Sequence, residues 1–192
     1  MKRLGAIVIA VAVTLAGCGT GTPPAGQLKD ISGMMPDLEF DMTSQTGAEV
    51  TAQDFQGAPV LLYFGYTSCP DVCPTTLATV RAALAELGNA GRNVHVVFVT
   101  VDPKRDTTSQ LATYLGYFGP QFVGLTGDDA ALKRLTTRYR VGYSVGTPDA
   151  NGNYEVTHSS AVFVFDDKGE ARYLVRWGDP PEAIARALAK LV

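Results

Sequence analysis

The stretch YFGYTSCPDVCPTTL, residues 63–77, decides the fold of this chain. It begins at the end of PVLLYFG (59–65), a segment that is apolar throughout and therefore typical of a central strand covered on both faces. It then passes through two cysteines, Cys69 and Cys73, each followed by a proline. Apolar residues three to four apart over 75–88 predict a helix. The stretch thus predicts a strand, a loop that carries two thiols, and a helix.

Pro74 limits where that helix can begin. Its ring would clash with the carbonyl four residues earlier in a helical turn, so we expect the helix to start no earlier than about residues 71–73. Both cysteines then lie at or just before the helix amino terminus, where free N–H groups and the macrodipole favour thiolate over thiol. Asp71, between them, is expected to cap the helix or to tune the thiolates.

The rest of the chain alternates strands and helices, and closes with an antiparallel pair and a helix. This order predicts an α/β, thioredoxin-like fold over residues 36–192, with an amino-terminal β-hairpin and an inserted helix and hairpin. A dinucleotide-binding unit is disfavoured because the glycine fingerprint is missing after the first strand. Trp177 is expected in the core. The expected strands are 38–42, 49–55, 94–102, 122–127, 160–166 and 170–178, with helices capped by Asp106 or Thr107, by Asp128 and by Asp179, and a hairpin-like excursion over 141–160.

The amino terminus reads as a targeting segment. Residues 1–17 combine a positive start with an apolar run too short to span a bilayer, which predicts a signal peptide. The run ends in Leu-Ala-Gly-Cys18, which resembles a bacterial lipobox and predicts lipid attachment at Cys18; the alternative is an ordinary secretory signal. Residues 18–35, rich in glycine, proline and small polar residues, are expected to form a flexible tether. The protein would then be extracytoplasmic and lipid-anchored to a bacterial membrane.

Composition narrows the function. The 192 residues have a formal net charge of −3 and contain no basic run, which argues against nucleic-acid binding. With Cys18 carrying lipid, Cys69 and Cys73 remain, and a disulfide closing so small a loop would stabilise the fold little. Their spacing is one residue wider than the Cys-x-x-Cys of thioredoxin-type catalysts, and it favours a soft metal such as Cu(I) or zinc. Thiol–disulfide exchange remains the alternative.

Two histidines are available as a further ligand. His95 opens strand 94–102 and should lie ~17 Å from the edge that carries the cysteine loop. His158 precedes strand 160–166, which a thioredoxin-like pattern runs antiparallel, so that His158 lies at the cysteine edge. Cys69, Cys73 and His158 are therefore the candidate metal ligands, a set that suits copper in either oxidation state. Asp102 ends its strand at the same edge and precedes Pro103. An aspartate at this position is expected either because it favours a turn or because it supports the ligands from behind.

Three segments resemble the Sco/SenC family, the copper-binding assembly factors of cytochrome c oxidase: FGYTSCPDVCPTTL, VTVDPKRDT (99–107) and YEVTHS (154–159). The resemblance implies a thioredoxin fold and a copper site of Cys69, Cys73 and His158. It also implies delivery of copper to the binuclear site of oxidase subunit II, reduction of that site's cysteines, or both, with a periplasmic copper donor as a further partner. The chain departs from the family at Thr157, where relatives often have aspartate. A copper sensor or store would use the same ligands, and the sequence leaves enzymatic activity open.

Overall fold

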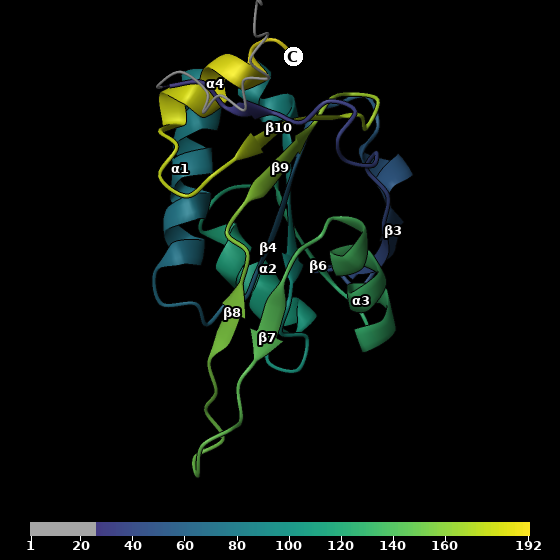
Figure 1. Ribbon diagram of the computed structural model, residues 1–192, viewed down its shortest axis with the longest axis vertical. Coiled ribbons are helices and arrows are strands. Elements are labelled where there is room, and N and C mark those ends of the chain that lie inside the picture. The colour runs from purple at the N-terminus through teal and green to yellow at the C-terminus, as the bar shows by residue number, and fades with distance from the viewer. Residues whose placement is uncertain (1–25) are drawn as a thin grey trace, which may run out of the picture.

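The computed structural model describes residues 26–192 (Figure 1), so the predicted signal peptide and the predicted lipid site at Cys18 lie outside the described residues. An eight-stranded sheet of order β1-β10-β9-β4-β5-β6-β2-β3 forms its centre. Parallel β4, β5 and β6, flanked by antiparallel β9, confirm the predicted thioredoxin-like arrangement. The strands are β1 (Lys29–Asp30), β2 (Asp41–Ser44), β3 (Glu49–Thr51), β4 (Val60–Gly65), β5 (His95–Thr100), β6 (Phe122–Thr126), β9 (Val162–Phe165) and β10 (Ala171–Val175).

Strand β4 is the centre of the core, as its apolar sequence predicts. All six of its residues are buried, between β5 on one side and β9 on the other. The predicted hairpin of residues 38–55 also forms, as β2 and β3. Its second strand is shorter than expected, because residues Ala52–Phe55 turn into the 3-10 helix η1.

The helices are α1 (Val72–Glu86), α2 (Thr108–Gly116), α3 (Asp129–Arg138) and α4 (Pro181–Leu188), with the 3-10 helix η2 (Ala90–Asn93) after α1. Helices α1 and α4 pack together, on the opposite side of the view from α3 (Figure 1). Thr107 and Asp128 cap α2 and α3 as predicted. The predicted cap at Asp179 is wrong: Pro180 is the N-cap, and the Asp179 carboxylate instead accepts hydrogen bonds from Arg176. Within the described residues no helix combines the length and hydrophobicity needed to cross a bilayer.

The structure corrects two further predictions. The expected tether of residues 18–35 does not extend as far as predicted, because β1 pairs with β10 and both Leu28 and Ile31 are buried. These apolar side chains gain a core contact, and β1 covers an edge that β10 would otherwise leave unpaired. Trp177 is not a core residue but 49% exposed, because it follows β10 in the loop that leads to α4.

The segment 141–160 forms the expected hairpin, made of β7 (Tyr143–Val145) and β8 (Val156–His158). These two strands form a separate sheet that projects from the body (Figure 1). Gly152, at the turn near its tip, has φ of 82°, a conformation that glycine adopts without strain. The hairpin returns into β9, and this connection fixes where His158 lies.

Candidate metal centre

The two cysteines lie where β4 gives way to α1. Helix α1 begins at Val72, within the predicted limit, so Cys73 is in its first turn and Cys69 just precedes it. Asp71 is the N-cap residue, but its carboxylate makes no capping bond and accepts a hydrogen bond from the Thr75 hydroxyl at 3.2 Å instead. The predicted side-chain cap is therefore wrong. The amino terminus of α1 is left with N–H groups free to face the sulfurs.

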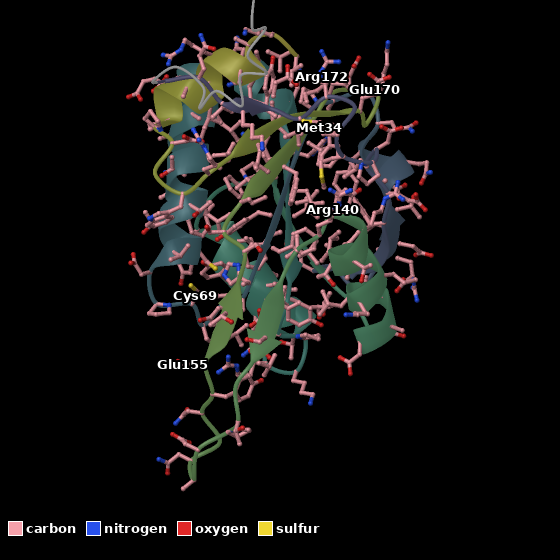
Figure 2. The ribbon with its side chains drawn as sticks, in the orientation of Figure 1. Met34, Cys69, Arg140, Glu155, Glu170 and Arg172 are labelled. Atoms are coloured by element: carbon pink, nitrogen blue, oxygen red, sulfur yellow. The ribbon has the colours of Figure 1, made fainter. Side chains whose placement is uncertain are left out.

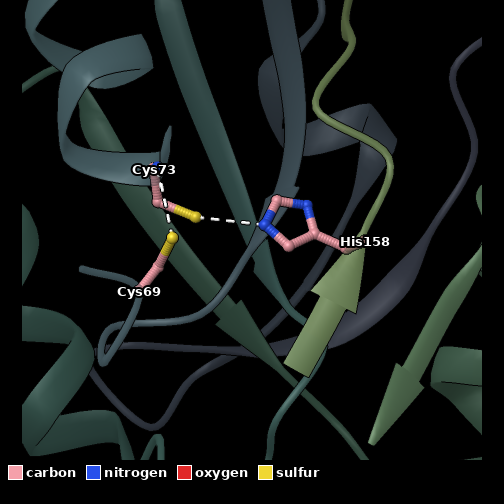
Figure 3. Close-up of side chains that lie close together, drawn as sticks. All are labelled: Cys69, Cys73 and His158. Carbon is pink, nitrogen blue, oxygen red and sulfur yellow. Dashed lines mark hydrogen bonds between the residues drawn. The ribbon is translucent and has the colours of Figure 1, made fainter. Parts of the chain in front are cut away.

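The third predicted ligand arrives from the other half of the chain. Because β9 runs antiparallel to β4, with Val162 opposite Tyr63, the residues before β9 lie at the carboxyl end of β4. His158 at the end of β8 thus faces the start of α1 (Figure 3). The ligand atoms of Cys69, Cys73 and His158 lie within 4.8 Å of one another, and both cysteines are free thiols. The structure brings the three predicted ligands together.

The imidazole of His158 is held with one nitrogen directed at the sulfurs. Its Nδ1 lies 2.9 Å from the Ser159 carbonyl oxygen, and its Nε2 lies 3.2 Å from the Cys73 sulfur. A carbonyl only accepts, so Nδ1 carries the proton and Nε2 presents its lone pair to the cysteines. Burial lowers the pKa of His158, which keeps the ring neutral at pH 7. The rings of Tyr63 and Tyr66 both pack against the imidazole in a T-shaped arrangement. Their centroids lie 6.0 and 5.9 Å, respectively, from the centroid of the imidazole.

The two thiols differ, contrary to the expectation that both favour thiolate. Burial raises the pKa of Cys73 to about 12, because that side chain has no exposed surface. Burial also opposes ionisation of Cys69, but the N–H groups of Cys73 and Asp71 donate to its sulfur and hold its pKa below the usual value. Cys69 is half-buried, and its thiol ionises more readily than that of Cys73. Cys73 gives up its proton only to something that stabilises its charge strongly, such as a metal ion.

A buried carboxylate that the sequence analysis assigned only to a helix cap anchors the loop before Cys69. Asp106 is fully buried and accepts hydrogen bonds from the Thr67 N–H at 2.9 Å, the Thr67 hydroxyl at 2.6 Å and the Thr100 hydroxyl at 2.6 Å. It thereby ties the loop that leaves β4 to the end of β5. In the sequence, the VDPKRDT segment was the signal that could have pointed to Asp106. The N-cap of α2 is Thr107 rather than Asp106.

Asp102, the other carboxylate of that segment, acts on the hairpin. It is 2% exposed, accepts a 2.7 Å hydrogen bond from the Tyr154 hydroxyl and pairs with Arg105. The Arg105 guanidinium also donates to the Tyr154 carbonyl and lies 3.8 Å above the centre of the Tyr154 ring. These contacts fasten the strand that carries His158 to the end of β5. Asp102 therefore acts on the residues that lead into β8, through Tyr154, and a role behind the ligands stays a prediction.

Gly65, the last residue of β4, makes room for the Cys73 sulfur. A Cβ at this position would lie 2.9 Å from that sulfur and 2.7 Å from the Phe98 ring, closer than real contacts allow. The sequence shows a glycine before the cysteine loop but not what it avoids. His95, in contrast, lies where the sequence predicts. It pairs with Val60 at the opposite end of the sheet and packs edge-on against Phe55.

The site opens into a cleft of about 590 Å³. Its walls are the loop that holds Cys69, the strand that holds His158, and the side chain of Trp177 from the loop before α4. Cys69 and His158 are partly exposed, whereas Cys73 is not. The cleft thus gives solvent a route to Cys69 and His158.

Comparisons with known proteins agree with this geometry. The SCO1/SenC family model matches residues 33–192. The SCO2-like protein of Rickettsia felis is 38% identical over 133 residues, which cover 69% of this chain but only 65% of that protein. The structure of Bradyrhizobium japonicum ScoI with copper bound is 35% identical, with a TM-score of 0.74 over 81% of this chain and 99% of that one. BsSco, described as a member of the Sco family of cytochrome c oxidase assembly proteins, shares the fold at 17% identity, with a TM-score of 0.63 over 86% of this chain and 99% of that one.

Proposed function

This chain belongs to the SCO1/SenC family, and we propose that it is a copper metallochaperone that holds Cu(I) or Cu(II) on Cys69, Cys73 and His158. The observation that carries the proposal is the convergence of two sulfurs and one imidazole nitrogen within 4.8 Å. Thiolates select soft ions such as Cu(I), and imidazole is a good ligand for either oxidation state of copper. The protonated Nδ1 of His158 leaves Nε2 free for the metal.

The arrangement of the site suits a metal that arrives and leaves. Structural zinc sites are usually closed by four protein ligands. Here three ligands converge, and one side is open through the cleft. The high pKa of the Cys73 thiol also means that binding releases a proton and that departure of copper takes one up. Copper is the cargo in this proposal, and the site both binds and releases it.

The proposed destination is the binuclear copper site of cytochrome c oxidase subunit II, with copper supplied by a periplasmic donor. Support comes from the family membership and from the description of a related fold as an oxidase assembly protein. We place the protein outside the cytoplasm, tethered to a bacterial membrane by lipid on Cys18. The lipobox-like sequence and the signal-like residues 1–17 support this placement.

A second function has its own supporting observation. Cys69 has a lowered pKa and a partly exposed sulfur, and its N–H donor is the backbone of Cys73, whose buried thiol can resolve a mixed disulfide. The same pair can therefore reduce a disulfide of the target to two thiols and become the Cys69–Cys73 disulfide itself, and a copy with both thiols reduced then delivers the copper. Exchange activity that persists without metal and in His158→Ala would favour this function over metal delivery.

Copper titration against a competing chelator tests the metallochaperone proposal. Cys69→Ala and His158→Ala should each weaken copper binding by more than about 100-fold, beyond the 10–100-fold typical of residues behind the ligands. His95→Ala is the matched control, because it removes the other histidine at the far end of the sheet, and it should bind copper as the wild type does. Unchanged binding in both ligand variants would reject the site.

A further inference from the structure

Trp177 is a large aromatic side chain that the fold does not bury, and it stands beside the ligands. It is 49% exposed, and it lines the same 590 Å³ cleft as Cys69 and His158. A single exposed aromatic residue is ordinary on a protein surface. Its place in the wall of the cleft sets it apart, because tryptophan is among the residue types most enriched where partners bind tightly.

Trp177 also borders a second hollow, of about 300 Å³, on its other side. This hollow lies between α1 and the start of α4, and apolar side chains such as Val80, Val175 and Ile184 contribute to its walls. The indole is therefore shared by two adjoining depressions. A segment of a partner that enters the cleft toward Cys69 therefore also meets the indole, which lines the second, more apolar hollow as well.

Copper exchange itself determines what must enter the cleft. The ion does not travel free; each of its bonds to this chain is replaced by a bond to a ligand of the partner. No electron changes hands, because the ion keeps its oxidation state throughout. Because Cys73 has no exposed surface, a ligand of the partner has to approach from the Cys69 and His158 side, within the walls that Trp177 completes.

The rim of the cleft adds a charge preference. Asp71 and Glu155 are both exposed, and neither forms an ion pair among residues 26–192. Figure 2 shows Glu155 on the same side of the molecule as Cys69. The only other charged residues that line the two hollows, Arg176 and Asp179, pair with each other. The unpaired charges that line the two hollows are thus both negative, and they complement a partner with lysine or arginine beside its metal ligands.

We propose that Trp177, with the hollows on either side of it, is the docking site for the protein that exchanges copper with this chain. The occupant is a copper-binding domain whose soft ligands lie on a protruding loop. An apolar side chain of that loop packs on the indole and in the hollow between α1 and α4, and basic residues face Asp71 and Glu155. This inference rests on the proposed metallochaperone function and extends it to the partner.

Delivery from the Cu(I)-loaded full-length chain, in detergent micelles, tests the proposal with two acceptors. One is the apo copper-binding domain of oxidase subunit II, and the other is a small Cu(I) chelator that needs no docking surface. Trp177→Ala should slow transfer to the domain at least tenfold and leave both capture by the chelator and Cu(I) affinity unchanged. Tyr117→Ala, which removes a 75% exposed aromatic residue that lines neither hollow, is the matched control and should transfer at the wild-type rate.

The outcomes distinguish a failure of the docking site from a failure of the metallochaperone function. Transfer by Trp177→Ala at the wild-type rate overturns the docking site and leaves the metallochaperone function standing. No transfer from the wild type to the domain overturns both. Equal slowing toward the chelator and the domain means that Trp177 acts on the metal site itself, which also overturns docking. Asp71→Asn combined with Glu155→Gln should slow transfer to the domain at low salt, and the difference should shrink as salt is added.

Discussion

At the scale of single residues, the centre depends on the space around Cys73 as much as on the ligands. Gly65 and Cys73 come from a strand and a helix, yet a Cβ on the glycine would lie 2.9 Å from the sulfur. The Phe98 ring behind the glycine lies closer still, so the strand cannot retreat from the sulfur without disturbing the core. The position of one ligand is therefore fixed by the absence of a side chain on a neighbouring strand.

Gly65→Ala should lower copper affinity by about 10–100-fold, in the range seen when residues behind the ligands are changed. It should also cost about 1–3 kcal/mol in the free energy of unfolding, because the added methyl overpacks a buried site. Chelator competition and denaturant unfolding measure the two effects. Gly116→Ala is the control, since a Cβ there meets nothing within 4 Å, and it should bind copper normally. Normal affinity in Gly65→Ala would mean that the sulfur has freedom the structure does not show.

His95 gives a pH-dependent prediction that is separate from the metal site. Burial lowers its pKa below the ordinary value of 6.5, so the unfolded chain binds the proton more tightly than the folded chain does. The stability that neutral His95 contributes is complete above pH 6.5 and is lost as the pH falls through 6.5 toward the folded-state pKa. His95→Gln should therefore lose less stability than the wild type between pH 7.5 and pH 5. Denaturant unfolding at both pH values measures this; parallel losses would contradict it.

At the scale of elements, two connections hold the ligands in place. The loop between β4 and α1 is anchored by Asp106, and the β7–β8 hairpin is anchored by Asp102 and Arg105 through Tyr154. Both sets of anchors come from the segment that follows β5. That segment supplies no ligand, but it sets the positions of the cysteine loop and the histidine strand relative to each other.

Asp106→Ala should destabilise the chain by more than about 2 kcal/mol, because it leaves the N–H and hydroxyl of Thr67 and the hydroxyl of Thr100 without their acceptor in a buried site. Copper affinity should fall as well, since the loop loses its anchor. Denaturant unfolding and chelator competition are the measurements. Asp128→Ala, which removes an exposed helix cap far from the ligands in sequence, should cost only about 1 kcal/mol and leave copper binding unchanged. Equal effects of the two variants on copper affinity would remove Asp106 from its anchoring role.

At the scale of the whole molecule, the folded unit begins earlier than the sequence suggests. Leu28 and Ile31 are buried, and the two residues between them close one edge of the eight-stranded sheet against β10. A chain that begins at Pro36 should therefore be about 3–6 kcal/mol less stable than one that begins at Gly26, since it loses two buried apolar side chains. Comparison of their denaturant midpoints tests this. Identical midpoints would mean that residues 26–35 do not stabilise the fold and belong to the tether, as the sequence predicted.

The sequence by itself determined most of the local elements and the three candidate ligands. Hydrophobic period, prolines and turn residues are local signals, so they predicted β4, the start of α1 and the hairpin near Gly152. The antiparallel course of β9 was enough to place His158 beside the cysteines. Trp177 was misjudged, because hydrophobicity does not tell whether a loop faces the core or a cleft.

Only the tertiary structure decided how the centre works. The contrast between the two thiols follows from the deeper burial of Cys73 and from the N–H groups that donate to Cys69, and burial is a property of packing between segments far apart in the sequence. The same reason applies to the role of Gly65, to the anchoring bonds of Asp106 and to the exposed face of Trp177. A sequence names the side chains that can bind copper. The pKa of each thiol, the contacts around Gly65 and Asp106, and the exposure of Trp177 all depend on neighbours that only the folded chain brings together.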